Sequence, residues 1–220
     1  MMTASAQHIL FSSSSPGAIP LVGTLTVSPS AQGNPGVMLC HWAPAAEVSN
    51  DTLLSSIESQ LAARGTTTLR LNVCDAHRRP DTFAEGDPIL LDLAGAIEFL
   101  LSRPRVCASS LFLVGHGFGS VVALACARAD HRVAALAAVS PPLYLADTAL
   151  PGVSCPTLLL TGELDEVCPP DELSALAPRL AASPMVETIP GARHMLRGHE
   201  REAAALVTAF LELHTATAVS

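Results

Sequence analysis

The stretch LFLVGHGFGS, residues 111–120, decides the fold. It begins as an apolar run typical of a buried strand, passes through Gly115-His116-Gly117-Phe118-Gly119, and continues into the helix-like stretch VVALACARAD, residues 121–130. Glycines between a strand and a helix predict a tight turn, because glycine adopts backbone conformations that strain other residues. At the centre of this turn, Gly117 has no side chain to present.

Short β-rich segments alternate with helical patterns from residue 36 onward. This alternation is typical of a parallel sheet with crossover helices. The predicted strands are 36–42, 66–74, 110–115, 133–140, 156–162 and an edge strand at 184–190. The predicted helices are 50–64, 89–103, 121–130, 170–181 and 199–214.

Three of these helices carry apolar residues at helical spacing, which predicts the faces that pack on the sheet. Asn50 or Asp51 is the expected N-cap of the first helix. The predicted faces are Leu53, Leu54, Ile57 and Leu61; Leu90, Leu93, Ile97 and Leu100; and Leu206, Phe210 and Leu213.

Upstream of the alternating pattern, residues 8–14 and 19–28 predict an antiparallel hairpin joined by Pro16-Gly17. The sequence has no internal repeat and no dividing linker. We therefore expect a single domain over 1–220, with a hairpin and loop in 1–35 and a core in 36–214. The connection between strands 133–140 and 156–162 is too short to fold as a lid domain.

The composition excludes several function classes. The 220 residues include 12 basic and 20 acidic side chains, and every basic one is an arginine. An acidic chain argues against non-specific nucleic-acid binding, and the absence of lysine excludes Schiff-base chemistry and a P-loop. No run reaches the roughly 18 apolar residues of a membrane helix. We expect no cofactor and no membrane span.

Cysteine usage and the N-terminal composition bear on the compartment. The cysteines form no C-x-x-C pair, and in apolar surroundings they are expected to be core residues in a reducing compartment, the cytoplasm. Ser12 to Ser15 and the lack of acids in the first 46 residues leave an organellar destination open. The six cysteines are Cys40, Cys74, Cys107, Cys126, Cys155 and Cys168.

Three separated positions line up with this strand order. Gly117 lies at the turn after a central strand, Asp165 follows the strand 156–162, and His194 follows the strand 184–190. The carboxyl ends of parallel strands open on one crevice, so these residues are expected to converge there. We expect Asp165 and His194 to be hydrogen-bonded to each other.

In this order of turn, acid and histidine the sequence resembles the α/β-hydrolase superfamily, and within it small lidless hydrolases of the dienelactone-hydrolase-like kind. The matching stretches are SPP at 140–142, TGELDEVCPP at 161–170 and PGARHM at 190–195. The resemblance implies an α/β-hydrolase fold. That fold has a mostly parallel central sheet, an N-terminal antiparallel hairpin, helices on both faces and no lid.

The resemblance also implies roles for the catalytic positions. In the family a serine at the position of Gly117 attacks an ester or related acyl carbon, the counterpart of His194 removes its proton, and the counterpart of Asp165 orients that imidazole. The five-residue turn 115–119 is then the nucleophile elbow, hereafter the elbow.

A second set of residues is expected around the oxyanion. The backbone N–H of Phe118 joins one from the loop after His41 to hold the oxyanion, and Trp42 belongs to that loop. His41 keeps a family position under the loop. His116 keeps the common Gly-His-x-x-Gly residue and packs beside the sheet.

Gly117 stands where the family has its serine. The catalytic base, the acid and the oxyanion donors therefore have no nucleophile to act on. We therefore expect a catalytically inactive pseudo-hydrolase that is a structural or interaction subunit of a larger assembly, or a binder of a small acyl-like ligand. The alternative is an active esterase or acyl hydrolase with a non-serine mechanism, in which His194, oriented by Asp165, directs a bound water.

Three other arrangements of these residues are less consistent with the sequence. Ser120 lies inside the helix, so its hydroxyl is expected to bond a backbone carbonyl rather than replace the nucleophile, and Cys126 is expected in the core. A dinucleotide-binding turn needs a glycine where Ser120 stands. His41, His116 and His194 with Asp165 would suit zinc, but we expect no metal.

Overall fold

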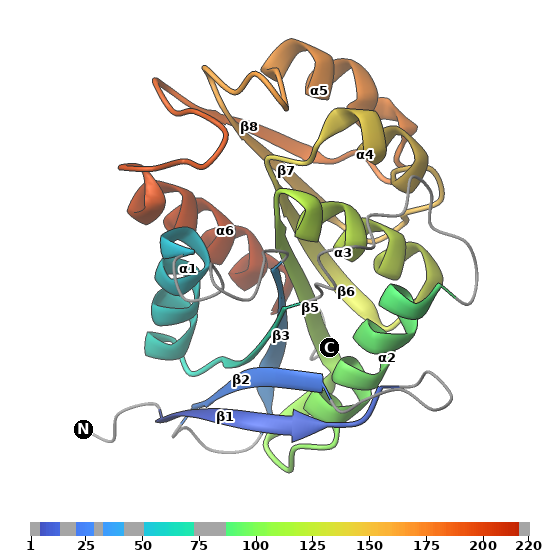
Figure 1. Cartoon of the computed structure of the whole chain (residues 1–220), viewed down its shortest axis with the longest axis vertical. Helices are drawn as coiled ribbons and strands as arrows, with labels where there is room; N and C mark the ends of the chain where they lie inside the picture. Colours follow the sequence, from blue (N-terminus) through green and yellow to red (C-terminus); the bar gives the residue numbers. More distant parts are fainter. Residues whose placement is uncertain (1–4, 14–20, 29–32, 42–50, 73–86, 216–220) are drawn as a thin grey trace.

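Eight strands of the described residues form one sheet in the order β1-β2-β4-β3-β5-β6-β7-β8 (Figure 1). The computed structural model describes residues 5–13, 21–28, 33–41, 51–72 and 87–215. The strands are β1 (Ser5–Phe11), β2 (Leu21–Val27), β3 (Asn34–His41), β4 (Thr67–Asn72), β5 (Val106–His116), β6 (Val133–Val139), β7 (Thr157–Gly162) and β8 (Met185–Ile189).

The sheet is mostly parallel, as predicted. β2 pairs antiparallel with β1 and with β4, while every other neighbouring pair, from β3/β4 to β7/β8, is parallel. The predicted N-terminal hairpin is therefore present as β1 and β2. Some predicted features lie outside the described residues. These are the hairpin turn at Pro16-Gly17, the alternative N-cap Asn50, and the strand ends at Trp42 and at residues 73–74.

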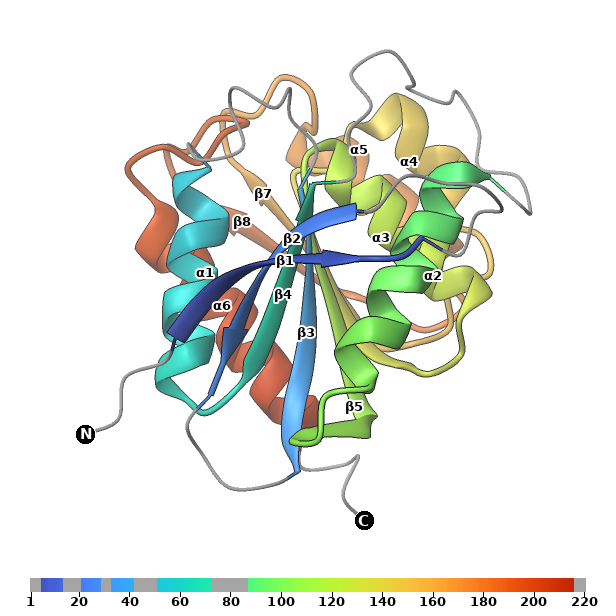
Figure 2. The ribbon, with the colours of Figure 1, turned by 60° about the horizontal axis from the view of Figure 1, so that its bottom comes forward.

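Helices cover both faces of the sheet (Figures 1 and 2). The helices α1 (Thr52–Ala63) and α6 (Glu200–Thr215) lie side by side on one face. The opposite face carries α2 (Pro88–Leu101) and α3 (Phe118–Ala129), with α4 (Leu143–Ala149) and α5 (Pro170–Leu176). None of the described helices is long and apolar enough to span a membrane.

Alternate residues of the central strands enter two different cores, as the two-residue period of a strand requires. On β3, Met38 and Cys40 pack among α2 and α3, whereas Val37 and Leu39 pack against α1 and α6. All four side chains are buried. A strand covered on both faces has no polar side, which explains its continuous apolar sequence.

The first two predicted helical faces are largely observed, and the third needs a correction. Leu53, Leu54, Ile57 and Leu61 are all buried on α1, and Leu93, Ile97 and Leu100 are buried on α2 while Leu90 is partly buried. On α6, Leu213 is 63% exposed. The face that packs on α1 and the sheet is centred on Ala203, Val207, Phe210 and Leu211 instead.

Two element boundaries also differ from the prediction. β5 begins at Val106, four residues before the predicted start at 110, and its first residues are largely exposed. The predicted helix 170–181 ends as α5 at Leu176 and continues as a 3₁₀ turn, Ala177–Arg179. Pro178 lies in that turn, and a proline removes one helical hydrogen bond and clashes with the preceding turn.

The carboxyl ends of β3, β5, β6 and β7 form the part of the sheet where the predicted site residues lie. Between β6 and β7, residues 140–156 contain one short helix, α4, and no other helix or strand. The connection therefore holds no lid domain, as predicted.

Candidate active site

Gly117 joins β5 to α3 in a conformation that favours glycine. Its φ is 55° and its ψ is −127°. The Gly117 N–H donates to the carbonyl oxygen of Val139 on β6 at 2.9 Å, and the Gly117 carbonyl accepts from the N–H of Ser120 at 3.0 Å. Such a conformation costs a non-glycine residue roughly 1–3 kcal/mol. Glycine therefore suits this position on backbone grounds alone.

The two flanking glycines are required by close packing. A Cβ on Gly115 would lie 2.4 Å from the carbonyl oxygen of Gly119, and a Cβ on Gly119 would lie 2.2 Å from the carbonyl oxygen of Cys40 on β3. Both distances are far below contact. A Cβ on Gly117, in contrast, would meet no atom of the described residues within 4 Å. The elbow thus excludes side chains at its two flanks and leaves open space at its centre.

Asp165 lies just after β7 and is held by several donors. Its side chain is fully buried. The backbone N–H groups of Val167 and Cys168 donate to Oδ1 at 2.9 and 2.8 Å. The hydroxyl of Thr161 lies 3.3 Å from Oδ2 and 2.7 Å from the carbonyl oxygen of Cys168, and this closer oxygen is the better acceptor for its single hydrogen. Burial opposes ionisation of this carboxyl, but the hydrogen bonds from His194, Cys168 and Val167 outweigh it and lower its pKa to about 2. Asp165 is therefore a carboxylate at neutral pH.

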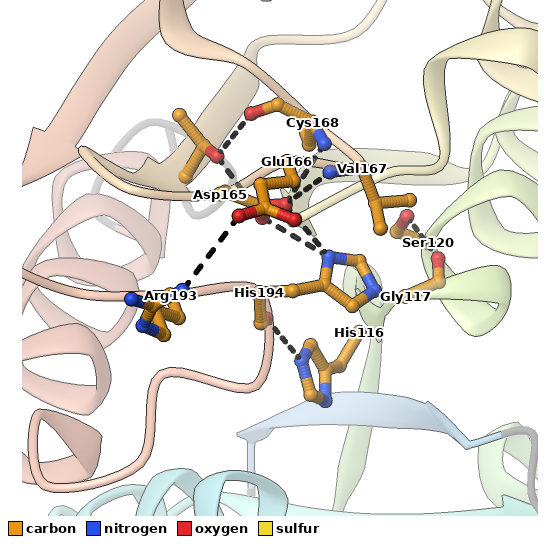
Figure 3. Close-up of polar contacts among 10 residues, drawn as sticks. His116, Gly117, Ser120, Asp165, Glu166, Val167, Cys168, Arg193 and His194 are labelled. Carbon is orange, nitrogen blue, oxygen red and sulfur yellow. Dashed lines mark hydrogen bonds and ion pairs between the residues drawn. The ribbon is translucent and has the colours of Figure 1, made fainter.

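His194 faces Asp165 (Figure 3). Its Nδ1 lies 3.0 Å from both carboxylate oxygens of Asp165. A carboxylate only accepts, so Nδ1 carries the proton. Figure 3 shows the opposite edge of the ring, with Nε2, turned toward Gly117. The His194 side chain is 28% exposed, so part of the ring is in contact with solvent.

Asp51 organises a second cluster that sequence reasoning identified only as a helix cap. Its Oδ1 accepts from the N–H of Leu54 at 2.9 Å and caps α1. Its Oδ2 lies 2.9 Å from Nδ1 of His41 and 3.3 Å from Nδ1 of His116. Burial again opposes ionisation, but the hydrogen bonds from His116, His41 and Leu54 hold the pKa of Asp51 well below its usual range.

This cluster reaches the loop that carries His194. The Nε2 atom of His116 lies 3.4 Å from the backbone carbonyl oxygen of His194, and the two rings are 6.4 Å apart between centroids. The buried carboxylate of Asp51 and the His116 ring therefore join four segments: the end of β3, the start of α1, the elbow and the His194 loop. No sequence motif marks this role of Asp51, because an N-cap aspartate looks the same whether or not imidazoles reach its second oxygen.

The remaining predicted site residues are placed as follows. The hydroxyl of Ser120 donates to the carbonyl oxygen of Gly117 at 2.6 Å, as predicted. Phe118 is the first residue of α3, so its backbone N–H lies at the amino end of that helix. Trp42 lies outside the described residues.

The predicted alternative of a zinc site finds no matching cluster among the described residues. None of them forms a group of three or more His, Cys, Asp or Glu side chains that could hold a metal ion. His41 and His116 face Asp51, whereas His194 faces Asp165.

The comparison with known families finds one whose model covers most of the described core. The model of the dienelactone hydrolase family matches residues 76–212, more than half of the chain. The chain belongs to the dienelactone hydrolase family. No curated protein has a sequence that matches it.

Solved structures share the α/β-hydrolase fold over nearly the whole chain. A dienelactone hydrolase from Anabaena variabilis is 20% identical with a TM-score of 0.78, covering 97% of this chain and 99% of its own. An α/β serine hydrolase homologue from Coxiella burnetii is 20% identical with a TM-score of 0.75, covering 95% and 98%. An α/β serine hydrolase without lid from Xanthomonas campestris is 19% identical with a TM-score of 0.72, covering 97% and 95%. The predicted fold and family are therefore confirmed.

Proposed function

We propose that this protein is a non-catalytic member of its family that binds a small acyl-like ligand over the elbow. The observation that carries the proposal is Gly117: the elbow has the strained backbone that presents a nucleophile, and its central residue has no side chain. In this proposal Asp165 and His194 are the remnant acid and base. The N–H of Phe118 and the strand ends at His41 and His116 line the place where an acyl oxygen is held, while the predicted contribution of Trp42 lies outside the described residues.

Among the described residues, the hydroxyl of Ser120 and the thiols of Cys126 and Cys168 do not offer a substitute nucleophile. Ser120 is fully buried, and its hydroxyl is already donated to the carbonyl of Gly117. The thiols of Cys126 and Cys168 are buried, and burial raises the pKa of each to about 12. A thiol with such a pKa stays protonated at neutral pH, and the thiol form is a poor nucleophile.

Binding remains compatible with this arrangement. The open space above Gly117 admits an atom of a ligand where a serine side chain would otherwise stand. The amino end of α3 favours partial negative charge, such as that on a carbonyl oxygen. The Nε2 edge of His194 adds a hydrogen-bonding group on the other side (Figure 3).

A second candidate function is hydrolysis by a directed water, and the intact Asp165–His194 pair favours it. In that mechanism Nε2 of His194 takes a proton from a water placed above Gly117, and the hydroxide attacks the acyl carbon. The proton then leaves with the alcohol as the ester bond breaks. The water would occupy the volume that the missing side chain leaves open.

One experiment separates the two functions. Purified protein is incubated with a fluorophosphonate probe and assayed with p-nitrophenyl acetate, beside the variant His194→Ala. The non-catalytic proposal expects no labelling and the same background ester hydrolysis for both proteins. Hydrolysis by the wild type that His194→Ala abolishes would instead establish the water-directed mechanism.

A further inference from the structure

Exposed apolar side chains occur on the segments that carry or adjoin the Asp165–His194 pair. Eight large apolar side chains of the described residues are exposed, and half of them lie on segments that border this pair. We call these four the apolar rim: Tyr144 (67% exposed), Leu164 (48%), Val167 (40%) and Met195 (45%). Leu164 and Met195 are the immediate chain neighbours of Asp165 and His194. A concentration of exposed apolar groups at one site is typical of a binding surface.

Backbone hydrogen bonds hold the segments of the rim together. The N–H of Leu164 donates to the carbonyl of Ala192 at 2.8 Å, which joins the loop after β7 to the loop of His194. The N–H of Leu143 lies 3.5 Å from the carbonyl oxygen of Val167, which places the start of α4 beside the same loop. Tyr144 follows Leu143 directly. The rim therefore comes from three segments that meet at the site.

Met195 is exposed although both of its chain neighbours are held in place. On one side, His194 is bonded to Asp165. On the other, Leu196 is fully buried and has a φ of 49°, an unusual conformation for leucine. The loop keeps the strained backbone of Leu196, and the Met195 side chain remains exposed to solvent. Strained positions cluster at functional sites, where the surrounding structure maintains them.

The charge near the rim is predominantly negative. The loop after β7 and the start of α5 carry Glu163, Glu166, Asp171 and Glu172, in addition to the paired Asp165. The segment after β8 supplies Arg193 and Arg197, and the Arg193 guanidinium already lies 3.7 Å from a carboxylate oxygen of Glu166. The chain as a whole has a formal net charge of −8. This field opposes an anionic ligand.

We propose that the site selects an uncharged carbonyl compound with an apolar tail, and discriminates against carboxylates with the same tail. The carbonyl lies over Gly117 between the amino end of α3 and His194, and the aliphatic or aromatic tail lies on the apolar rim. This inference rests on the proposed binding function and names the class of ligand for it.

The test uses ligands that contain no hydrolysable bond. Binding of 2-octanone, 2-butanone and heptanoate to the purified protein is measured by saturation-transfer NMR and calorimetry. 2-Octanone is expected to bind about tenfold or more tightly than 2-butanone, because four additional methylenes contact the rim. It is expected to bind more tightly than heptanoate, which carries the same hexyl tail, by a similar factor. Equal or tighter binding of heptanoate, or no binding of 2-octanone, overturns the inference.

Two methionines provide a matched pair of variants. Met195 on the rim and Met185 at the opposite, amino end of β8 are 45% and 43% exposed. Met195→Ser is expected to weaken 2-octanone binding about threefold to tenfold, whereas Met185→Ser leaves it unchanged. Leu164→Ser, with Leu213→Ser as its control, tests the rim independently, and thermal unfolding verifies that each variant is folded. Equal effects of rim and control variants contradict the proposal.

The ligand preference can be measured whether or not the proposed non-catalytic function is correct. If the wild type proves to hydrolyse esters, the non-catalytic proposal fails, yet the preference between a ketone and a carboxylate is still read from compounds that cannot turn over.

Discussion

The Nδ1 atom of His194 lies 3.0 Å from both carboxylate oxygens of Asp165, in a protein whose elbow offers no hydroxyl for the pair to activate. The pair does not need a catalytic reason to persist. The Asp165 carboxylate is fully buried, and an ionised group removed from water is costly unless its oxygens accept hydrogen bonds. His194 supplies one of these bonds, and the loop after β7 supplies others.

Asp165→Ala is therefore expected to destabilise the fold by about 1.5–3 kcal/mol at neutral pH, the usual range for hydrogen bonds to a charged group. Glu166→Ala is the matched control, because its side chain is 88% exposed, and it should change stability little. Urea unfolding of both variants and the wild type measures the difference. An Asp165→Ala protein as stable as the control would mean that the two side chains are apart and solvated.

The difference in unfolding free energy between the wild type and Asp165→Ala should decrease as the pH falls. The pKa of Asp165 in the folded protein, about 2, is below the ordinary value of 3.8. The ionised carboxylate therefore stabilises the folded state above about pH 4, and this contribution is lost as the pH falls toward 2. The gap in unfolding free energy between wild type and Asp165→Ala should narrow over that window. A gap that widened toward low pH would contradict the lowered pKa.

Asp51→Ala is expected to cost more than the loss of a helix cap. Asp87 caps α2 with a similar bond, from the N–H of Ile89 at 2.9 Å, so Asp87→Ala should cost about 1 kcal/mol. Asp51→Ala removes the corresponding cap and also leaves the imidazoles of His41 and His116 without their shared acceptor. We expect a loss of about 3 kcal/mol, since uncompensated buried polar groups add to it.

Chemical denaturation of the Asp51 and Asp87 variants, compared with the wild type, measures this difference. Because His116 contacts the backbone of His194, the NMR signals of the His194 ring should also shift in Asp51→Ala and stay unchanged in Asp87→Ala. Equal losses of stability and an undisturbed His194 would show that Asp51 acts as a cap alone.

The sequence was sufficient for the arrangement of the sheet because that arrangement depends on local patterns. Apolar runs, helical periodicity and the glycines of the elbow each report on their own segment, and the flanking glycines have no sterically tolerable replacement. The position of Gly117, Asp165 and His194 at one edge of the sheet then follows from the parallel direction of β5, β6, β7 and β8. The buried face of α6 does not follow from spacing alone, because a spacing of three or four residues fits adjacent faces of a helix. Packing against α1 and the sheet buries Val207 and Leu211 and leaves Leu213 exposed.

The cluster of Asp51, His41 and His116 could not be predicted in the same way. It depends on where the start of α1 lies against the ends of β3 and β5, which is a tertiary relationship with no local pattern. The apolar rim is likewise invisible in sequence, because Leu164, Val167 and Met195 look like ordinary core residues until their exposure is known.

Ser140→Gly is expected to stabilise the protein by about 1 kcal/mol. Ser140 follows β6 with a φ of 47°, and its fully buried hydroxyl has no hydrogen-bond partner among the described residues. Glycine removes the backbone strain and the unsatisfied hydroxyl together. Leu196 has a similar φ of 49° but is packed in the core, so Leu196→Gly should destabilise by about 2–5 kcal/mol. Thermal unfolding distinguishes the two; a less stable Ser140→Gly would show that the hydroxyl has a partner.

Restoring the hydroxyl at the elbow tests the site most directly. In Gly117→Ser the new Cβ meets no atom of the described residues within 4 Å, so they do not crowd it. The backbone strain should lower stability by roughly 1–3 kcal/mol. Gly117→Ala is the matched control, because it carries the same strain without a hydroxyl. Both variants should therefore unfold at similar denaturant concentrations.

Only the serine variant should gain reactivity. Its hydroxyl would face the Nε2 edge of His194, which Asp165 orients, so a fluorophosphonate probe should label Gly117→Ser above background and leave Gly117→Ala unlabelled. Combining Gly117→Ser with His194→Ala should remove the labelling, because the base is lost. We expect weak labelling and poor turnover of p-nitrophenyl acetate, since loss of one oxyanion donor alone lowers rates by about 10²–10³ and Pro44, in the loop after His41, has no N–H to offer. A Gly117→Ser protein that is folded yet as unreactive as Gly117→Ala would mean that His194 does not reach the elbow, and the proposed remnant site would have to be abandoned.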